Sequence, residues 1–230
     1  MPRTLAIGDI HGHLEALLAL EDLVPFRDED SLVFLGDYVD RGPHSKGVLD
    51  WLIERKSRGN VVTLLGNHDL MMRDAPHDDI VLDSWVVFGG DKTLLSYRQS
   101  EDKAIQFSDV PDEHWTFLRS CELWHETDSH IFVHACIDPA RPMAEQLQTT
   151  MLWEKLIDPQ PHYSGRIVIV GHTAQKFGWP FDAGHTICID TWIYGDGWLT
   201  CLDVDSREIW QANKAGETRR GHLDSGPEPD

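Results

Sequence analysis

The sequence contains no run of 18 or more apolar residues, which is about the length that a helix needs to cross a bilayer. The residues that precede the first apolar run, Met1 to Thr4, do not form a secretory signal pattern. We therefore expect a cytoplasmic protein with no membrane partner. At 230 residues, 41% of them hydrophobic, the chain suits one domain with a substantial core.

Basic residues are scarce. Lys and Arg number 20 against 39 Asp and Glu, which gives a formal net charge of −19. A surface with this balance repels nucleic acid and anionic membranes, so we expect no nucleic-acid partner. The same balance disfavours a phosphate site that works without metal ions. A phosphate pocket in this chain is therefore expected to contain metal.

Cysteine is also scarce, and the four cysteines contain no C-x-x-C pair. Without a secretory signal, the expected state is reduced thiols with structural roles.

What the sequence does contain is a repeated arrangement in which a short apolar run ends in a polar side chain suited to metal. The clearest case is residues 36–42, which follow the apolar run 32–35 and present Asp37, Asp40 and Arg41. Two carboxylates at the rim of a core are costly unless a cation pairs with them. The same arrangement places Asp9 and His11, Asn67 and His68, His134, and His172 directly after four other apolar runs.

The order of the segments predicts an α/β fold. We expect strands near residues 4–8, 31–36 and 60–66 with helices near 12–23 and 44–58 between them, which is a βαβαβ pattern with parallel pairing. Ligands of such sheets gather beyond the carboxyl ends of the strands. Residues 70–128 have weak periodicity and predict a helical insert. Residues 1–213 are expected to form the catalytic domain, and the polar residues 214–230 a flexible tail.

These side chains suit a two-metal centre. Asp9 and His11 are two residues apart, so in extended chain they share one face, and a carboxylate with an imidazole suits Mn²⁺, Fe²⁺ or Zn²⁺. Asp37 can reach the same metal and bridge to a second one. The remaining predicted metal ligands are Asn67, His134 and His172.

Three further residues suit catalysis beside the metals. His68 is adjacent to Asn67, and Asp40 could orient it as a general acid. Arg41 offers a fork of donors to phosphate oxygens.

Together the five motifs resemble those of the calcineurin-like metallophosphoesterases, and more closely the phosphoprotein phosphatase branch of bacterial and phage serine/threonine phosphatases. The matching residues are Gly8 to Gly12, Gly36 to Gly42, Gly66 to Asp69, Val133 to Ala135 and Gly171 to Thr173. The resemblance implies a single-domain αββα sandwich of two mixed sheets flanked by helices. It implies two divalent metals, with Mn²⁺ expected and Fe or Zn as alternatives. Asp9, His11 and Asp37 would hold one metal, and Asp37, Asn67, His134 and His172 the other.

The resemblance also implies roles in binding phosphate. Arg41 and Asn67 would contact the substrate. Lys155, in the stretch Leu152-Trp153-Glu154-Lys155, stands where phage-type members have a second phosphate-binding arginine, so it keeps the charge and loses the bidentate fork. Arg166 is the alternative for that role. Trp192 stands where relatives have glycine, and it either lines the substrate pocket or packs at its rim.

Three functions follow from these expectations. The first is a phosphatase acting on phosphoserine, phosphothreonine and also phosphotyrosine in proteins, or on small phosphoesters, by direct attack of a metal-bound hydroxide. The alternative is a dinucleoside polyphosphate hydrolase that acts on diadenosine tetraphosphate. The symmetrical tetraphosphatases tend to have alanine where this chain has Asp40, which favours the first. A non-catalytic binding module is the third, and the complete set of predicted ligands argues against it.

Overall fold

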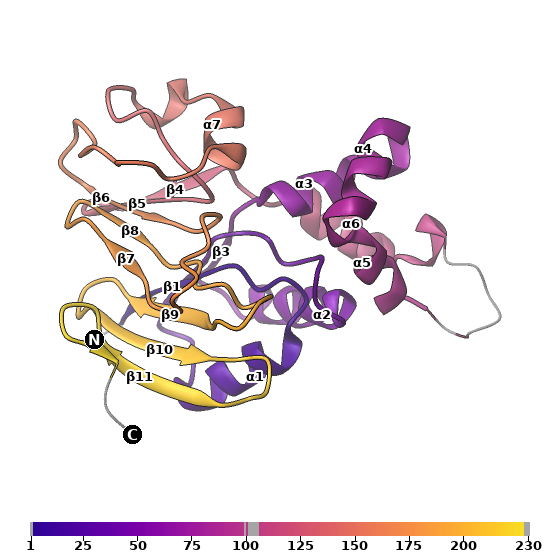
Figure 1. Ribbon diagram of the computed structural model, residues 1–230, viewed down its shortest axis with the longest axis horizontal. Helices are drawn as coiled ribbons and strands as arrows, with labels where there is room; N and C mark the ends of the chain where they lie inside the picture. The colour runs from indigo at the N-terminus through magenta and orange to yellow at the C-terminus, as the bar shows by residue number, and fades with distance from the viewer. Residues whose placement is uncertain (1, 99, 101–105, 228–230) are drawn as a thin grey trace.

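The computed structural model describes residues 2–98, 100 and 106–227, and two β-sheets packed face to face form its centre (Figure 1). Within the described residues, the first sheet has the strand order β12-β11-β10-β9-β1-β2-β3 and the second has the order β4-β5-β6-β8-β7. Strands β1, β2 and β3 run parallel, as do β5, β6 and β8, whereas β9 pairs antiparallel with β1, β4 with β5 and β7 with β8. Both sheets are therefore mixed.

The strands of the first sheet are β1 (Thr4–Ile7), β2 (Ser31–Phe34), β3 (Val61–Thr63), β9 (Leu199–Asp203), β10 (Glu208–Ala212), β11 (Thr218–His222) and β12 (Gly226–Pro227). Those of the second are β4 (Trp124–Glu126), β5 (His130–Val133), β6 (Ile167–Val170), β7 (Phe181–Asp182) and β8 (Thr186–Cys188). The α-helices are α1 (Leu14–Leu23), α2 (Ser45–Lys56), α3 (Asn67–Asp74), α4 (Asp79–Trp85), α5 (Asp91–Ser96), α6 (Asp112–Arg119) and α7 (Gln148–Trp153).

Alternation along the strands explains why the sheets stack. In β1, Leu5 and Ile7 pack in the core cluster shared with the helices, whereas Ala6 packs in the cluster between the sheets. In β6, Ile169 faces the same inner layer, and Val168 points to the opposite face, where α7 packs. Because successive strand side chains point to opposite faces, strands with apolar residues at every position need cover on both sides. The prediction of an αββα sandwich is confirmed.

Helices α3 to α6 form a lobe beside the end of the first sheet (Figure 1). The lobe includes the short segments η1 (Ala75–His77), η2 (Val86–Gly90) and η3 (Phe107–Asp109), and in η2 the chain kinks at Gly89, whose φ of 110° is not helical. Residues 70–119 are mainly helical where they are described. However, β4 lies inside the predicted insert 70–128 and belongs to the second sheet, because its residues pair with β5.

The prediction of a flexible tail from residue 214 is wrong for residues 214–227. Strand β11 pairs antiparallel with β10, and β12 pairs with β11. Arg219 explains the order of this polar segment. Its guanidinium lies 4.1 Å from the ring centroid of Trp198, and its Nε donates to Gln211 Oε1 at 2.7 Å. An arginine stacked on an aromatic ring stabilises a strand that has few apolar residues of its own. Residues 228–230 lie outside the described residues.

Candidate active site

The candidate site lies where parallel strands of both sheets end. The turns after these strands contribute Asp9 and His11 after β1, Asp37, Asp40 and Arg41 after β2, Asn67 and His68 after β3, His134 after β5 and His172 after β6. The structure thus brings together all six predicted metal ligands and the three predicted catalytic residues at one edge of the sandwich. Residues as far apart as Asp9 and His172 meet here, with the backbone N–H of His172 donating to the two Asp9 carboxylate oxygens at 3.2 and 3.1 Å.

Glycine allows the turns after β2 and β3 to approach each other. A Cβ on Gly36 would lie 2.5 Å from the backbone nitrogen of Gly66, and one on Gly66 would lie 2.2 Å from Asp37 Oδ1. Gly36 also has a φ of 100°, which other residues rarely adopt. Any side chain at these positions would push Asp37 out of the site.

Asp69 holds the same two turns together. One of its oxygens accepts from the backbone N–H of Asp37 at 2.7 Å and from that of Gly66 at 3.0 Å, and the other accepts from Tyr38 at 3.0 Å. The carboxylate is buried. It therefore fixes the backbone on either side of Asp37 without reaching the reacting groups itself.

Several site residues have strained backbone conformations. The φ angles are 47° at His11, 54° at Asp37, 73° at Asp40, 69° at Arg41 and 60° at His172, all in the left-handed region. Each costs on the order of 1–3 kcal/mol when the residue is not glycine. Such conformations persist only where the surrounding structure imposes them, and here they aim the side chains into one space.

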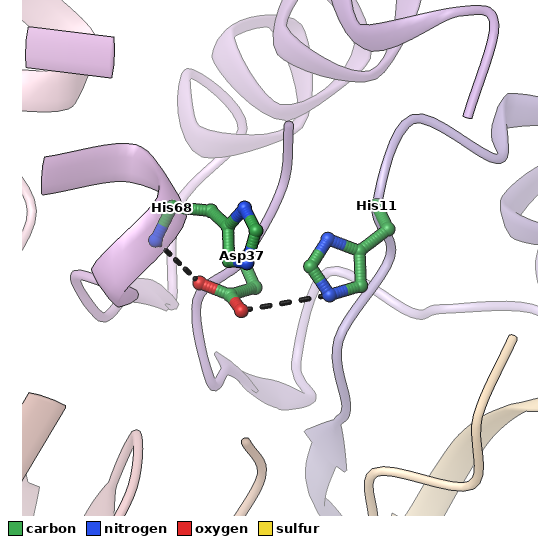
Figure 2. Close-up of side chains that lie close together, drawn as sticks. All are labelled: His11, Asp37 and His68. Atoms are coloured by element: carbon green, nitrogen blue, oxygen red, sulfur yellow. Dashed lines mark hydrogen bonds and ion pairs between the residues drawn. The ribbon is translucent and has the colours of Figure 1, made fainter. Parts of the chain in front are cut away.

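Asp37 lies between two imidazoles. Its Oδ2 is 3.5 Å from His11 Nε2, and its Oδ1 accepts from the backbone N–H of His68 at 3.0 Å (Figure 2). The same Oδ1 is 3.4 Å from His134 Nε2. Ligand atoms of His11, Asp37 and His68 form one close group, and those of Asp37, His134 and His172 form another. A carboxylate shared by two such groups is suited to bridging a pair of divalent cations.

The histidine tautomers fit this use. His11 Nδ1 lies 3.0 Å from the carbonyl oxygen of Val39, and His134 Nδ1 lies 2.8 Å from that of Leu35. A carbonyl only accepts, so both Nδ1 atoms carry the proton and both Nε2 lone pairs face the site. Burial lowers the pKa of both imidazoles, which keeps them in the neutral form that binds metal.

The carboxylates also fit a cation. Asp9 and Asp37 are buried together with Asp190, which the sequence analysis did not assign to the site. Burial raises the pKa of Asp9 well above its ordinary value, and the charges of Asp190 and Asp37 add to this. Burial also raises the pKa of Asp190 to about 6. Three buried carboxylates beside neutral imidazoles give this part of the site an excess of negative charge. A pair of divalent cations bound there would neutralise that charge.

His68 and Asp40 form the pair that was predicted. His68 Nδ1 donates to Asp40 Oδ2 at 2.6 Å, and both side chains are buried. Burial raises the pKa of Asp40, and the hydrogen bond from His68 opposes that change. The carboxylate therefore holds the ring in one orientation, with Nε2 facing the cleft.

Two residues that support Asp40 were missed. Trp85 Nε1 donates to both Asp40 oxygens at 2.9 Å, and Thr93 Oγ1 donates to Oδ1 at 2.7 Å. The backbone N–H of Asp40 also donates to Thr93 Oγ1 at 2.8 Å. Both residues come from the helical lobe, 45 and 53 positions further along the chain. Only the folded arrangement brings them to Asp40, and no local motif in the sequence marks them.

Arg41 faces the cleft between two histidines. Its Nη1 and Nη2 donate to His11 Nε2 at 2.8 Å and His68 Nε2 at 2.9 Å, and its guanidinium lies 3.9 Å from the ring centroid of Tyr194. Tyr194 is another residue that sequence reasoning missed. The Arg41 guanidinium lies against the Nε2 atoms of both histidines, which further indicates that the space beside these atoms favours positive charge.

Lys155 reaches the same cleft from the loop that follows α7. The cleft has a volume of about 200 Å³, and it is lined by Asp37, Arg41, Asn67, His68, Phe88, Trp153, Lys155 and His172. Lys155 Nζ donates to the carbonyl oxygen of His172 at 2.9 Å. Arg166 does not take its place, because it precedes β6 at the opposite end of that strand and pairs with Glu126.

The sequence comparison identifies the family. The model for calcineurin-like phosphoesterases matches residues 2–176, more than half of the chain. The chain belongs to the calcineurin-like phosphoesterase family. The predicted family is confirmed, and with it a hydrolase that acts on phosphoesters.

Curated relatives of this calcineurin-like phosphoesterase carry the name of the alternative activity, not that of a protein phosphatase. Proteins from Methylobacillus flagellatus and Nitrosomonas europaea, both named symmetrical bis(5'-nucleosyl)-tetraphosphatase, are 34% and 33% identical over 59% and 64% of this chain. The protein of the same name from Salmonella paratyphi C is 35% identical over 59%. These alignments cover 44%, 51% and 44% of the relatives, so the chain matches about half of their length.

Solved structures agree on the fold of the calcineurin-like phosphoesterase. A putative diadenosine tetraphosphatase superposes with a TM-score of 0.64 at 21% identity, covering 98% of this chain and 97% of that one. The cold-active protein-tyrosine phosphatase of a psychrophilic Shewanella species gives 0.62 at 18% identity, covering 97% and 80%. At these identities the likeness shows the fold alone.

In the part of the chain that the structure describes, no helix is both long and apolar enough to span a membrane.

Trp192 packs at the rim of this phosphoesterase site. A Cβ on Gly195 would lie 2.2 Å from the Trp192 ring, and Lys176 Nζ lies 5.5 Å from its centroid. Among the described residues, the ones that line the cleft do not include Trp192. Its ring lies beside Gly195 and Tyr194, with the Trp192 and Tyr194 ring centroids 6.3 Å apart.

Proposed function

We propose that this protein is a two-metal hydrolase that cleaves dinucleoside polyphosphates such as diadenosine tetraphosphate. The name shared by the curated relatives supports the substrate class, and Asp37 between two imidazoles is the observation that supports the chemistry. With water added across the central phosphoanhydride bond, the products would be two molecules of ADP.

Asp9, His11 and Asp37 would hold one divalent ion, and Asp37, Asn67, His134 and His172 the other, with Mn²⁺ as the first choice. Such ions activate water and neutralise charge on the reacting phosphate. The remaining groups act on the substrate directly. Arg41 and Lys155 bring positive charge into the cleft for phosphate oxygens, as a guanidinium fork and as a point charge. His68 Nε2 faces the leaving group, and Asp40, which accepts from Nδ1, would stabilise the imidazolium form that can give a proton from Nε2.

A phosphoprotein phosphatase is the second candidate, and the His68–Asp40 hydrogen bond of 2.6 Å favours it. A serine or threonine side chain leaves as a basic alkoxide, which needs a proton from a well-placed acid. ADP leaves as a stable anion that needs little protonation. A carboxylate that supports His68 therefore adds more to cleavage of a phosphoprotein than to cleavage of a dinucleotide.

One assay tests both candidates. The Mn²⁺-loaded protein is given diadenosine tetraphosphate, or peptides that contain phosphoserine, phosphothreonine or phosphotyrosine, and ADP and phosphate are quantified. We expect a higher kcat/KM for diadenosine tetraphosphate than for the peptides, with two molecules of ADP formed for each molecule of dinucleotide cleaved. A preference for the peptides would reject it in favour of the second candidate.

The Asp40→Asn variant adds a mechanistic control to this assay. It should slow peptide hydrolysis strongly and dinucleotide hydrolysis weakly, because only the peptides have an alkoxide or aryloxide leaving group. If the variant slows peptide and dinucleotide hydrolysis equally, Asp40 does not act through protonation of the leaving group.

A further inference from the structure

An apolar groove opens beside the phosphate cleft. Its volume is about 290 Å³, and its walls come from α3, α4, the η2 turn and the end of α7. Phe88 and Trp153 line both the groove and the cleft, so the two spaces adjoin. The side chains of Leu70, Met71, Ile80 and Val81 complete most of its surface.

The two shared residues are unusually exposed aromatic side chains. Phe88 is 51% exposed and Trp153 is 42% exposed. Phe88 also lies close to the catalytic residues, with its ring centroid 6.4 Å from that of His68. Large aromatic rings that stay open to solvent beside a polar cleft mark a binding surface for an apolar or planar group.

Charge separates the roles of the two spaces. The cleft contains the cations Arg41 and Lys155. Among the described residues, Asp74 is the one acidic or basic residue that lines the groove, and Asp78 and Asp79 stand at the start of α4, as its N-cap and its first residue. Phosphate is therefore repelled from the groove, whereas an uncharged ring is not. A ligand that fits both spaces has a phosphate chain attached to an uncharged planar group.

The groove is tied to the phosphate-binding turn through the backbone. Gly89, next to Phe88 at the kink of η2, has a φ of 110°, and its carbonyl oxygen accepts from the backbone N–H of Arg41 at 3.3 Å. A Cβ at Gly89 would lie 2.8 Å from that nitrogen. The kinked η2 turn therefore presents Phe88 at a fixed position relative to Arg41.

We propose that the groove between Phe88 and Trp153 is a subsite for one nucleobase of the substrate. The inference rests on the proposed function, and it names the residues that would give that function its preference for a nucleotide. The base stacks against the exposed rings, while the phosphates lie in the cleft against Arg41 and Lys155.

Equilibrium dialysis of the Mn²⁺-loaded protein with AMP and with ribose 5-phosphate tests the subsite without requiring turnover. The two probes share a phosphorylated sugar and differ in the base. Stacking on aromatic side chains predicts that AMP binds roughly five- to a hundredfold tighter. The ratio should fall towards one in Phe88→Ala and in Trp153→Ala. The matched control is Phe177→Ala, because Phe177 is 80% exposed and lines neither space.

The outcomes separate the two proposals. Equal affinity of the wild type for both probes, or an unchanged ratio in both groove variants, overturns the subsite even if diadenosine tetraphosphate is cleaved. A tenfold preference for AMP that both variants abolish supports the subsite even if that dinucleotide is not cleaved, in which case the proposed function fails alone. Equal affinity together with weaker phosphopeptide binding in Phe88→Ala would assign the groove to a peptide side chain and overturn the inference.

Discussion

Replacing Trp85 by phenylalanine should slow the cleavage of substrates with poor leaving groups, although Trp85 lies outside the cleft. Its indole N–H donates to both oxygens of Asp40, and Asp40 in turn holds His68. Phenylalanine keeps an aromatic ring at this buried position and can keep the stacking on Phe107, which lies 6.1 Å away between centroids. The change therefore removes one donor and little packing.

The size of the effect follows from the type of hydrogen bond that is lost. A hydrogen bond to a charged group contributes about 1.5–3 kcal/mol. If all of it acts on the transition state, kcat falls roughly ten- to a hundredfold, since about 1.4 kcal/mol corresponds to a factor of ten. Part of the loss will be offset, because Thr93 still donates to Asp40 at 2.7 Å. We expect a fall of about tenfold.

The assay compares phosphoserine peptide with 4-nitrophenyl phosphate, which has a good leaving group, in Trp85→Phe, Asp40→Asn and the double variant. The peptide rate should fall in each single variant, and the nitrophenyl rate should stay within about a factor of two. In the double variant the two effects should not multiply, because Trp85 acts through Asp40.

Trp51→Phe is the matched control. Its indole also donates to a carboxylate, Glu21 Oε2 at 3.0 Å, but neither residue lines the cleft. Equal slowing of both substrates by Trp85→Phe, or multiplied effects in the double variant, would refute the reasoning. Trp85 would then be a residue of the lobe's core with no role in proton transfer.

Three further predictions concern the ligands and the pH dependence of stability. Asp37→Asn should lose bound metal and nearly all activity, because the bridging charge is gone, and metal analysis of the purified variant would contradict this if two ions remain. His68→Asn should keep both metals and lower kcat, most for poor leaving groups, and loss of metal would show that His68 is a ligand. His13 is buried, and burial lowers its pKa to about 4, so the unfolded chain takes up a proton first as the pH falls. Its contribution to stability is thus present above about pH 6.5 and is lost towards pH 4, which amounts to about 2 kcal/mol at pH 5. In urea unfolding, His13→Gln should lose less stability than the wild type between pH 7 and pH 5, and parallel losses would contradict the shift.

The parts of the fold that the sequence predicts well are those set by local pattern. The runs ending at Gly8, Gly36 and Gly66 contain apolar residues at successive positions, which is typical of strands buried on both faces. The ligands follow those strands directly, so parallel topology alone brings them to one edge. Asp37 and His134 could therefore be predicted as metal ligands from the sequence, although Asp37 follows a strand of one sheet and His134 a strand of the other.

The parts that the sequence did not predict depend on contacts between distant segments. Trp85 and Tyr194 are typical core or surface aromatics by sequence, and their roles come from Asp40 and Arg41, which lie far away in the chain. Strand β11 was missed because its stability comes from Arg219 on Trp198 and not from apolar residues of its own. Polarity alone does not distinguish such a strand from a flexible tail.

The origin of the ligands in both sheets has a consequence for how the protein folds. The ligands from Asp9 to Asn67 follow strands of one sheet, and His134 and His172 follow strands of the other. Neither half of the chain holds a complete site, so the ligand set forms only when the two sheets have docked. Asp9 and His172 are 163 positions apart, and such long-range closure is slow. Uptake of metal during refolding would therefore report the docking of the sheets, and the bound ions would join the two layers that the site spans.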